Sequence, residues 1–343
     1  MFTAYVAVTI LLGSAVYFLR RSWAGNVALL LFSLSLCFTS LEGYYRFLYL
    51  QSDGMGRLMK NFAARYYRIG AHGLRASHLP LSLTKSNLIV VGDSHVFGAG
   101  LKRPAERFSE ILAAHYPALH VVNLGIPGWD TKSEMEQFTK YVGESQAGIP
   151  LVILTYFFND IEEDVTAVDR ERDPSPYPPA QETTLDRVLQ SASKYSRFVE
   201  MMYYRLGYPR LVRDRLGQIQ LFYKDPVIRT RHLATLERFR DLVKERYSAR
   251  MLVVVLPYLH TDALLQQTNF YQDFETALRE HGFDYIPMQP VFAPYGVSKL
   301  RVNRFDPHTN VFANQLIAHA IIDYLDQHPE TLPRQHPSAG LSP

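Results

Sequence analysis

The chain opens with two apolar stretches that are separated by a pair of arginines. Residues 2–19 and residues 22–41 contain no charged side chain, and each stretch is close to the length that a helix needs to cross a bilayer. Arg20 and Arg21 lie between them, so the pattern predicts a tight hairpin of two transmembrane helices over residues 1–42. By the positive-inside rule, the short basic loop stays in the cytoplasm and everything after Glu42 faces outward.

A cleaved signal peptide is the alternative for the first stretch. A signal peptide has a basic segment before its apolar core and a small-residue cleavage site after it. Residues 2–19 show neither clearly, and a second apolar stretch follows, which favours two retained helices. Arg46, Arg57 and Lys60 argue for the opposite orientation, but long domains cross the membrane largely regardless of their charge.

After residue 85, short apolar runs alternate with segments of helical spacing. Residues 43–85 have the aromatic character of a juxtamembrane connector. Strands are predicted over residues 87–91, 119–123, 150–156, 250–256 and 283–287, and helices over residues 105–115, 133–142 and 313–325. This alternation predicts an α/β domain over residues 86–328, with a parallel sheet and helices on both of its faces.

Residues 162–247 interrupt the alternation. Residues 173–179 are rich in proline and predict a loop, whereas residues 184–247 are mostly helical with many arginines and tyrosines. We interpret the stretch as an insertion, either a lid or membrane-facing cap or a pair of helices that only covers the sheet. Several prolines in residues 329–343 predict a disordered tail.

Composition and charge narrow the function classes. The 343 residues are 47% hydrophobic and 20% charged, which is an ordinary globular balance. A net charge of +3 without a basic run disfavours nucleic acid as a partner. The single cysteine, Cys37, excludes an intramolecular disulfide, and no Cys/His cluster has the spacing of zinc ligands.

The tripeptide Gly92-Asp93-Ser94 follows the first predicted strand and places a serine where substrate is expected. In parallel α/β sheets, ligands bind at the carboxyl ends of the strands. A serine hydroxyl is a weak nucleophile until a base removes its proton. Because the same tripeptide occurs in ordinary turns, a nucleophilic Ser94 requires a base elsewhere in the chain.

His308 is the candidate base, in the tripeptide Asp306-Pro307-His308. An imidazole takes up and returns a proton near neutral pH, and Asp306 is suited to hold its tautomer and stabilise the imidazolium. An alternative role for Asp306 is to cap the following helix. His260, after a predicted strand, is a rival base, whereas His319 is expected to be structural in a packed helix.

A tetrahedral intermediate also needs donors for its negative oxygen. The candidates are the backbone N–H groups of Ser94 and Gly128 and the side-chain amide of Asn159, which follow the first, second and third strands. Such preorganised donors contribute roughly 3 to 4 kcal/mol each. Turn geometry alone is the alternative explanation for Gly128, and a loop cap is the alternative for Asn159. Asp160 is expected to orient loop backbone.

The order and spacing of these motifs resemble the SGNH/GDSL hydrolase superfamily, in its membrane-anchored bacterial form. Ser94, Gly128 and Asn159 match the first three motifs of that superfamily, and Asp306 and His308 match the last one. The resemblance covers about residues 87–325 apart from the insertion. It departs at Phe157, where a glycine is common, and we expect this ring to narrow the acyl pocket. The resemblance implies a three-layer flavodoxin-like fold and ester hydrolysis through an acyl-serine, without a metal or nucleotide cofactor.

The leading hypothesis is a serine esterase in the bacterial cytoplasmic membrane, with its catalytic domain facing the periplasm or exterior. It would remove O-acetyl groups from an envelope or exported polysaccharide. The alternatives are a lipid esterase, such as a lysophospholipase or thioesterase, and an O-acyltransferase component that works with a membrane acyltransferase or polysaccharide-assembly partner. A binding protein that retains the fold without the chemistry is a fourth hypothesis.

Overall fold

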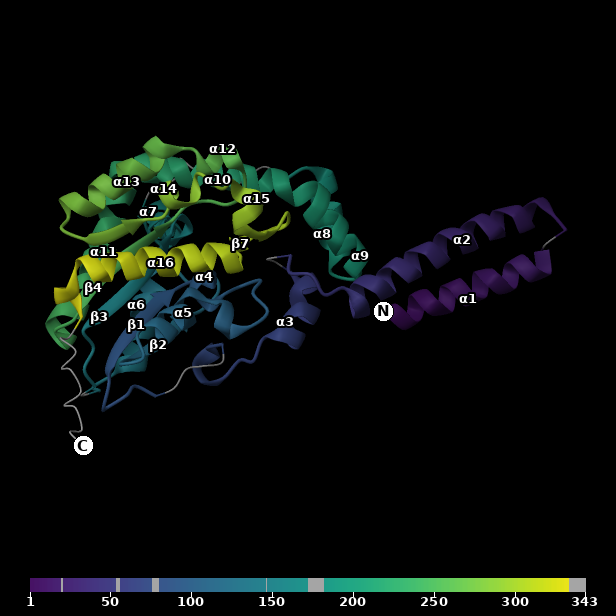
Figure 1. Ribbon diagram of the computed structural model, residues 1–343. Helices are drawn as coiled ribbons and strands as arrows, with labels where there is room; N and C mark the ends of the chain where they lie inside the picture. Colours follow the sequence, from purple (N-terminus) through teal and green to yellow (C-terminus); the bar gives the residue numbers. More distant parts are fainter. Residues whose placement is uncertain (20, 54–55, 76–79, 146, 172–181, 333–343) are drawn as a thin grey trace, which may run out of the picture. The chain divides into compact units, whose positions relative to one another are not determined.

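The computed structural model describes residues 1–19, 21–53, 56–75, 80–145, 147–171 and 182–332 (Figure 1). Contacts divide the chain into two compact units. The first contains residues 1–65 and 179–215, and the second contains residues 66–178 and 216–343. This division places the middle part of the predicted insertion, residues 179–215, with the apolar hairpin, whereas we had assigned the whole insertion to the α/β domain.

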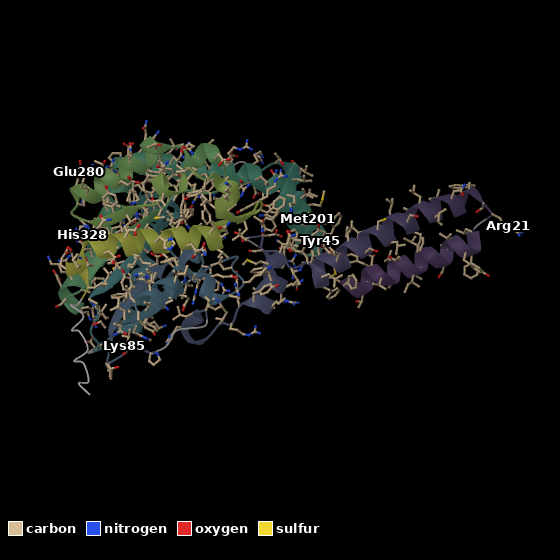
Figure 2. The ribbon with its side chains drawn as sticks, in the orientation of Figure 1. Arg21, Tyr45, Lys85, Met201, Glu280 and His328 are labelled. Atoms are coloured by element: carbon tan, nitrogen blue, oxygen red, sulfur yellow. The ribbon has the colours of Figure 1, made fainter. Side chains whose placement is uncertain are left out.

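The first unit begins with a pair of antiparallel apolar helices. Helix α1 spans Phe2–Leu19, and α2 spans Trp23–Gly43 and continues as a π-helical segment, Tyr44–Leu48. Both are long and apolar enough to cross a membrane, and most of their side chains are not buried within the unit. Arg21 lies at the turn of the hairpin, at the opposite end from Tyr45 (Figure 2).

Hydroxyl groups hold the two apolar helices together. Thr9 Oγ1 on α1 lies 2.7 Å from Ser35 Oγ and 3.0 Å from Thr39 Oγ1 on α2. It also donates to the carbonyl of Tyr5, 2.9 Å away, within its own helix. Hydrogen bonds of this kind between helices are a common means of association where the surroundings are apolar.

The remaining helices of the first unit are short. They are α3 (Lys60–Tyr66, which ends at the boundary of the unit), α8 (Thr184–Ser193), α9 (Arg197–Met202) and a π-helical segment, Tyr203–Gly207. Helix α10 (Tyr208–Lys224) begins in the first unit and ends in the second. Hydroxyl caps start two of these helices, because Thr183 accepts the N–H of Asp186 and Ser196 accepts that of Val199.

The second unit is built on a parallel sheet, as the alternation of strands and helices predicts. The strands are β1 (Ser86–Gly92), β2 (Leu119–Gly125), β3 (Leu151–Phe157), β4 (Arg250–Leu256) and β5 (Asp284–Pro287). Their order is β2-β1-β3-β4-β5, and every pairing is parallel. This order is that of flavodoxin-like folds.

The helices of the second unit connect and cover the strands. They are α4 (Ser94–Phe97), α5 (Phe108–His115), α6 (Thr131–Val142), α7 (Glu162–Glu171), α11 (Pro226–Tyr247), α12 (Asp262–Leu265), α13 (Thr268–Glu280), α14 (Gln289–Phe292), α15 (Val297–Leu300) and α16 (Val311–Gln327). A two-stranded antiparallel pair, β6 (Arg301–Asn303) and β7 (Asp306–Thr309), precedes α16.

Helices on both faces make the unit three layers deep. Helices α5 and α16 pack on one face of the sheet, where side chains such as Leu112 and Ile317 join a core with Leu88 and Ile153. Helices α6 and α11 lie on the other face, where the rings of Phe138 and Phe239 are 5.6 Å apart. Strands covered on both faces carry nearly continuous apolar runs, which is why they were recognisable in the sequence.

The second part of the predicted insertion packs on the sheet through polar contacts. His232 on α11 lies with its Nε2 2.8 Å from the Tyr156 hydroxyl on β3 and its Nδ1 2.9 Å from Asp164 Oδ2 on α7. The Tyr156 hydroxyl also contacts that of Tyr223 on α10. All four side chains are buried, so this network ties three helices to the central strand.

The structure differs from the sequence expectations mainly at the ends of elements. Helix α5 begins at Phe108 rather than at residue 105, because a 3-10 turn, Pro104–Glu106, precedes it. The predicted disordered tail begins with another such turn, Pro329–Thr331. The predicted proline-rich loop at residues 173–179 and the rest of the tail from residue 333 lie outside the described residues.

Candidate active site

The sheet brings the sequence motifs to one edge. Strand β1 lies between β2 and β3, and Gly92 at its end is paired with Gly125 and Thr155. Ser94, Gly128 and Asn159 follow these three strands. Because the strands are parallel, all three residues lie beyond the same carboxyl edge, where ligands bind in such folds.

Ser94 begins a short helix whose geometry depends on its neighbours. The Asp93 carboxylate accepts the N–H of His95 at 2.8 Å and so caps α4. Gly98 ends α4 in the left-handed region, with φ of 76°. A Cβ at Gly92 would lie 2.4 Å from Val96 Cγ2, so only glycine lets β1 turn this closely into the helix.

The second motif braces this helix from β2. A Cβ at Gly125 would lie 2.2 Å from the backbone nitrogen of Phe97, so a side chain at this position would displace α4. The Asn123 amide donates to the carbonyl of Val96 and to Ser109 Oγ, both at 2.8 Å. Asn123 and Gly125 therefore fix the backbone that carries Ser94.

Ser94, His308 and Asp306 form a continuous hydrogen-bonded chain. Ser94 Oγ lies 2.8 Å from His308 Nε2, and His308 Nδ1 lies 2.5 Å from Asp306 Oδ1. Asp306 is fully buried, while the His308 side chain is 16% exposed. The tautomer that fits these contacts has its proton on Nδ1, which leaves Nε2 to accept the serine proton.

The antiparallel pair β6–β7 presents the base. The N–H of Asp306 donates to Asn303 Oδ1 at 3.1 Å, and the N–H of His308 donates to Asp306 Oδ1 at 3.1 Å. Asn310, not Asp306, caps α16, because its Oδ1 accepts the N–H of Ala313 at 3.0 Å. The alternative interpretation of Asp306 as the helix cap is therefore wrong.

The environment of His308 favours its protonated form. Burial alone lowers the pKa of the imidazole, but the carboxylate of Asp306 and its hydrogen bond outweigh burial, and the pKa lies above its ordinary value. A base of this kind binds the serine proton more firmly than an isolated imidazole does. The carboxylate supplies this effect at close range, where the two charges attract most strongly.

Two further histidines lie near this chain. Burial lowers the pKa of His95 well below its ordinary value and lowers that of His260 to about 4, and the nearby His308 acts in the same direction. The ring of His95 lies 5.2 Å from that of His308. His319 is exposed on α16, so its predicted packed position is wrong.

The remaining predicted donors lie in turns at the sheet edge. Gly128 is exposed and has φ of 79°, a conformation that favours glycine. Asn159 lies in a 3-10 turn, Phe158–Ile161, directly after β3. Asp160 Oδ2 lies 3.5 Å from the backbone nitrogen of Phe157, which fits its expected contact with loop backbone. The role of Ser94, Gly128 and Asn159 as oxyanion donors stays a prediction.

Several aromatic rings pack close to the hydrogen-bonded residues Ser94, His308 and Asp306. The ring of Phe157 lies 4.7 Å from that of His95 and 5.2 Å from that of Tyr258. Phe157 itself is half-buried at the end of β3. The bulky ring therefore takes up space next to His95 that a glycine at this position would leave open.

Residues of the predicted connector brace the loop after α4, which sequence reasoning missed. The buried Arg75 guanidinium donates to the carbonyls of Gly98 and Leu101, at 2.7 and 2.8 Å. The Tyr67 hydroxyl accepts the N–H of Gly100 at 2.8 Å. A Cβ at Gly100 would lie 3.0 Å from Asp306 Oδ2, so this loop also packs against the carboxylate that orients His308.

A cluster of buried carboxyl groups lies beneath the edge of the sheet. Burial raises the pKa of Asp93, and it raises those of Glu134 and Asp160 well above their ordinary values. Neither carboxyl oxygen of Glu134 has a hydrogen-bond partner among the described residues. Within the described part of the chain, no group of three potential ligands could hold a metal ion. Burial therefore favours the protonated form of each of these three carboxyl groups.

A polar cavity lies elsewhere in the second unit. Its volume is about 770 Å³, and it is lined by residues of α10, α11 and α13 and the segment before α13, including Gln220, Lys224, Arg229 and Phe270. None of Ser94, Asp306 and His308 lines it. The candidate catalytic residues therefore lie at the edge of the sheet and not in this cavity.

Comparisons with known proteins find matches among solved structures. No protein-family model and no curated protein sequence matches the chain. Solved structures of lipolytic and GDSL-family proteins do match. A member of the lipolytic protein G-D-S-L family from Veillonella parvula is 12% identical, with 71% of this chain and 99% of that chain covered and a TM-score of 0.40.

Two other solved structures give similar values. The extracellular lipase of Streptomyces rimosus is 13% identical, with 70% of this chain and 99% of that chain covered and a TM-score of 0.44. The lipase/acylhydrolase of Enterococcus faecalis is 12% identical, with 74% and 100% covered and a TM-score of 0.39. At these identities the likeness concerns the fold alone.

Proposed function

We propose that this chain is a membrane-anchored serine hydrolase of the SGNH/GDSL type that cleaves an ester through an acyl-Ser94 intermediate. The observation that carries the proposal is the hydrogen-bonded chain from Ser94 Oγ through His308 to the buried Asp306. A nucleophile, a base and a group that orients the base are the three parts that nucleophilic ester cleavage needs. They come from β1–α4 and from β7, segments far apart in the sequence.

The proposed reaction begins when Ser94 Oγ attacks the ester carbonyl carbon and His308 Nε2 takes the hydroxyl proton. Asp306 stabilises the resulting imidazolium. As the tetrahedral intermediate collapses, its bond to the alcohol oxygen breaks, and His308 returns the proton to that oxygen. Water then attacks the acyl-serine with the same base and releases the acid and free Ser94. We propose that Ser94 N–H, Gly128 N–H and the Asn159 amide bind the oxyanion.

The proposed substrate is an O-acetyl group on an envelope or exported polysaccharide. The ring contacts of Phe157 with His95 and Tyr258 support a small acyl group, because these rings fill space close to His308, whose ring lies 5.2 Å from that of His95. The proposed place of action is the outer side of the cytoplasmic membrane. Helices α1 and α2, long and apolar enough to span a bilayer, support this anchoring, and the arginines between them support the orientation.

A panel of esters tests both the reaction and the size of the acyl group. The detergent-solubilised full chain is assayed with p-nitrophenyl acetate, butyrate and decanoate and with an acetylated polysaccharide. We expect acetate release and a preference for the acetate ester over the decanoate ester. Ser94→Ala should lose all turnover, whereas the control Ser191→Ala, at an exposed position, should keep the wild-type rate. A preference for decanoate would support a lipid ester instead. Full activity in Ser94→Ala would reject the mechanism.

A further inference from the structure

The first unit carries an amphipathic helix at the end of the apolar hairpin. Helix α8 (Thr184–Ser193) presents Leu185 and Val188, which are 64% and 58% exposed. Ala192 follows four residues after Val188, so these three side chains lie on one face of the helix. Tyr195, just beyond the helix, is 58% exposed. In water, an apolar face of this kind is unfavourable unless something covers it.

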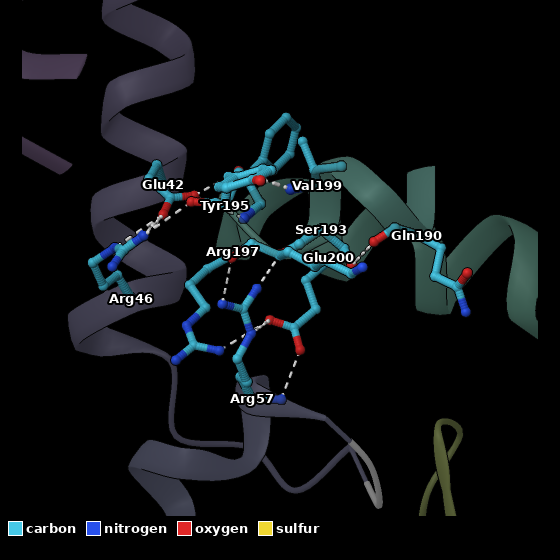
Figure 3. Close-up of polar contacts among 12 residues, drawn as sticks. Glu42, Arg46, Arg57, Gln190, Ser193, Tyr195, Arg197, Val199 and Glu200 are labelled. Atoms are coloured by element: carbon cyan, nitrogen blue, oxygen red, sulfur yellow. Dashed lines mark hydrogen bonds and ion pairs between the residues drawn. The ribbon is translucent and has the colours of Figure 1, made fainter. Parts of the chain in front are cut away.

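Polar contacts fix this segment to the hairpin. The Glu42 carboxylate near the end of α2 accepts the hydroxyl of Ser196 at 2.7 Å and the N–H of Phe198 at 3.0 Å (Figure 3). Its other oxygen accepts the guanidinium of Arg46, and the Arg46 guanidinium also reaches the carbonyl of Tyr195. Glu42 is fully buried. The carboxylate therefore holds the start of α9 at one height along α2.

A second set of polar contacts secures α9 from the other side. Glu200 accepts the backbone N–H of Arg57 at 2.6 Å and the guanidinium of Arg197 at 3.0 Å (Figure 3). The Arg57 guanidinium donates to the carbonyls of Lys194 and Ser193 at the end of α8. The turn between α8 and α9 is thus held by backbone contacts as well as by ion pairs, and its height along the hairpin is well defined.

Aromatic contacts show at which level of α2 the turn between α8 and α9 lies. The ring of Phe198 lies 5.8 Å from that of Phe38, and the Tyr5 hydroxyl donates to the carbonyl of Tyr195 at 3.4 Å. Phe38 precedes Gly43, the last residue of α2, by five residues, which is about 7 Å along a helix axis. The α8–α9 turn therefore reaches the last turns of the apolar stretch, where the hydrocarbon of a bilayer gives way to headgroups.

The direction and charge of α8 also suit a membrane surface. Figures 1 and 3 show α8 running across the direction of α2 rather than along it, as a helix in the plane of the membrane would. Arg187 on α8 and Lys194 just after it are exposed, and their spacing of seven residues puts both on the side opposite the apolar face. Basic residues on the polar face are typical of interfacial helices, which bury their apolar face at the boundary of headgroups and acyl chains.

From these observations we infer that α8 lies in the membrane interface, with Leu185, Val188 and Tyr195 in contact with lipid. The inference rests on the anchoring that we propose for α1 and α2, and it adds a second, in-plane attachment next to the hairpin. Lipid is the occupant that fits, because the segment is attached at the end of a hairpin whose own exposed side chains are apolar. In this arrangement the part of the insertion that belongs to the first unit faces the membrane.

Site-directed spin labelling of the full chain tests the inference. Cys37 is the only native cysteine, so a Cys37→Ser background accepts one label at a time. Labels are placed at Leu185→Cys and Val188→Cys, and at Arg187→Cys and Gln190→Cys as controls on other faces of α8. Leu30→Cys on α2, which is 59% exposed, reports the hairpin itself. The protein is reconstituted in nanodiscs of phosphatidylcholine and phosphatidylglycerol, and EPR power saturation compares collision with oxygen and with a water-soluble nickel chelate.

We expect oxygen to dominate at positions 185, 188 and 30, and nickel at positions 187 and 190. Dominant nickel at 185 and 188, with oxygen at 30, would overturn the inference and leave the anchoring intact. Protection from both reagents at 185 and 188 would show a protein surface over α8 and would also overturn it. Dominant nickel at position 30 would reject the anchoring and, with it, the inference.

Discussion

The 2.5 Å contact between His308 Nδ1 and Asp306 Oδ1 sets the strength of the proposed base. Asp306 is fully buried, so its charge acts on the imidazole with little screening by water. Burial by itself would make His308 a weaker base, and the carboxylate outweighs that effect. A kinetic pKa above the ordinary value of about 6.5 for histidine is the expected consequence.

Replacing Asp306 with asparagine tests this effect. For the wild type, kcat/KM for p-nitrophenyl acetate should rise with pH as His308 loses its proton, with an apparent pKa above the ordinary value. Asp306→Asn should lower kcat by roughly 10⁴-fold, because the tautomer and the charge are both lost. Its residual activity should titrate at lower pH than that of the wild type. A variant with wild-type rate and the same pH profile would contradict the assigned role.

At the scale of residues, the sequence predicts the candidate catalytic residues because they lie in short contiguous motifs. Ser94, Asp306 and His308 lie in short motifs, and their residue types alone suggest a nucleophile, an orienting group and a base. Tyr67 and Arg75 could not be found in this way. Their contacts with the loop after α4 join positions more than twenty residues apart, and nothing in the local pattern indicates them.

At the scale of elements, the loop after α4 depends on a guanidinium from a different segment. Arg75 is buried, donates to two backbone carbonyls and stacks on the ring of Tyr67 at 4.2 Å. Burial lowers the pKa of this guanidinium to about 10, which still leaves it charged at neutral pH. Without this guanidinium both carbonyls lose a charged donor, and the carbonyl of Gly98 keeps the N–H of Leu101 at 3.2 Å.

Arg75→Met should therefore destabilise the protein by about 2–5 kcal/mol, because two buried carbonyls lose a charged donor. Urea denaturation followed by circular dichroism measures the free energy of unfolding. The exposed Lys140→Met on α6 is the matched control and should change it by less than about 0.5 kcal/mol. Equal stability of the two variants would show that the loop does not need this brace.

A second prediction at the scale of elements concerns the buried hydrogen bonds that His232 makes with Tyr156 and Asp164. His232→Leu removes the partner of Tyr156 and of Asp164 in a buried setting, and we expect a loss of about 2–4 kcal/mol. His281→Leu is the control, since His281 pairs with Glu237 at the surface. A surface pair contributes at most about 1 kcal/mol. Similar losses in both variants would mean that the network does not hold α7 and α11 on the sheet.

For the molecule as a whole, the buried carboxyl cluster links stability to pH. The folded pKa of Glu134 lies well above the ordinary value of 4.5. Its stabilising contribution is therefore complete below about pH 4.5 and is lost as the pH rises through the folded pKa, because ionisation then favours the unfolded chain. Each unit of elevation corresponds to about 1.4 kcal/mol.

Glu134→Gln should remove this penalty. Near pH 4.5 we expect the Tm of the variant to equal or fall below that of the wild type. As the pH rises to 8, the Tm of the variant should rise relative to that of the wild type. Thermal unfolding of both proteins over this range measures it. Glu136→Gln is the control, because Glu136 is exposed on the same helix and should show no such trend. A constant difference between Glu134→Gln and the wild type would contradict a protonated Glu134.

The whole fold was predictable only in part. Alternating apolar runs and helical spacing predict the parallel sheet, because strands covered on both faces carry nearly uninterrupted apolar residues. The assignment of residues 179–215 to the hairpin was not predictable. It depends on contacts such as that between Glu42 and Ser196, which are 154 residues apart in sequence. No local periodicity reports a contact of that kind.

Labelling with a fluorophosphonate probe tests the central proposal, an activated Ser94, most directly. The reagent phosphonylates only a serine whose hydroxyl is made nucleophilic by a base. Wild-type full chain in detergent, Ser94→Ala and His308→Ala are treated in parallel, and the labelled peptide is identified by mass spectrometry. We predict labelling of the wild type at Ser94 and none in either variant. Folded wild type that is not labelled and releases no acid from any ester of the panel would contradict the proposal.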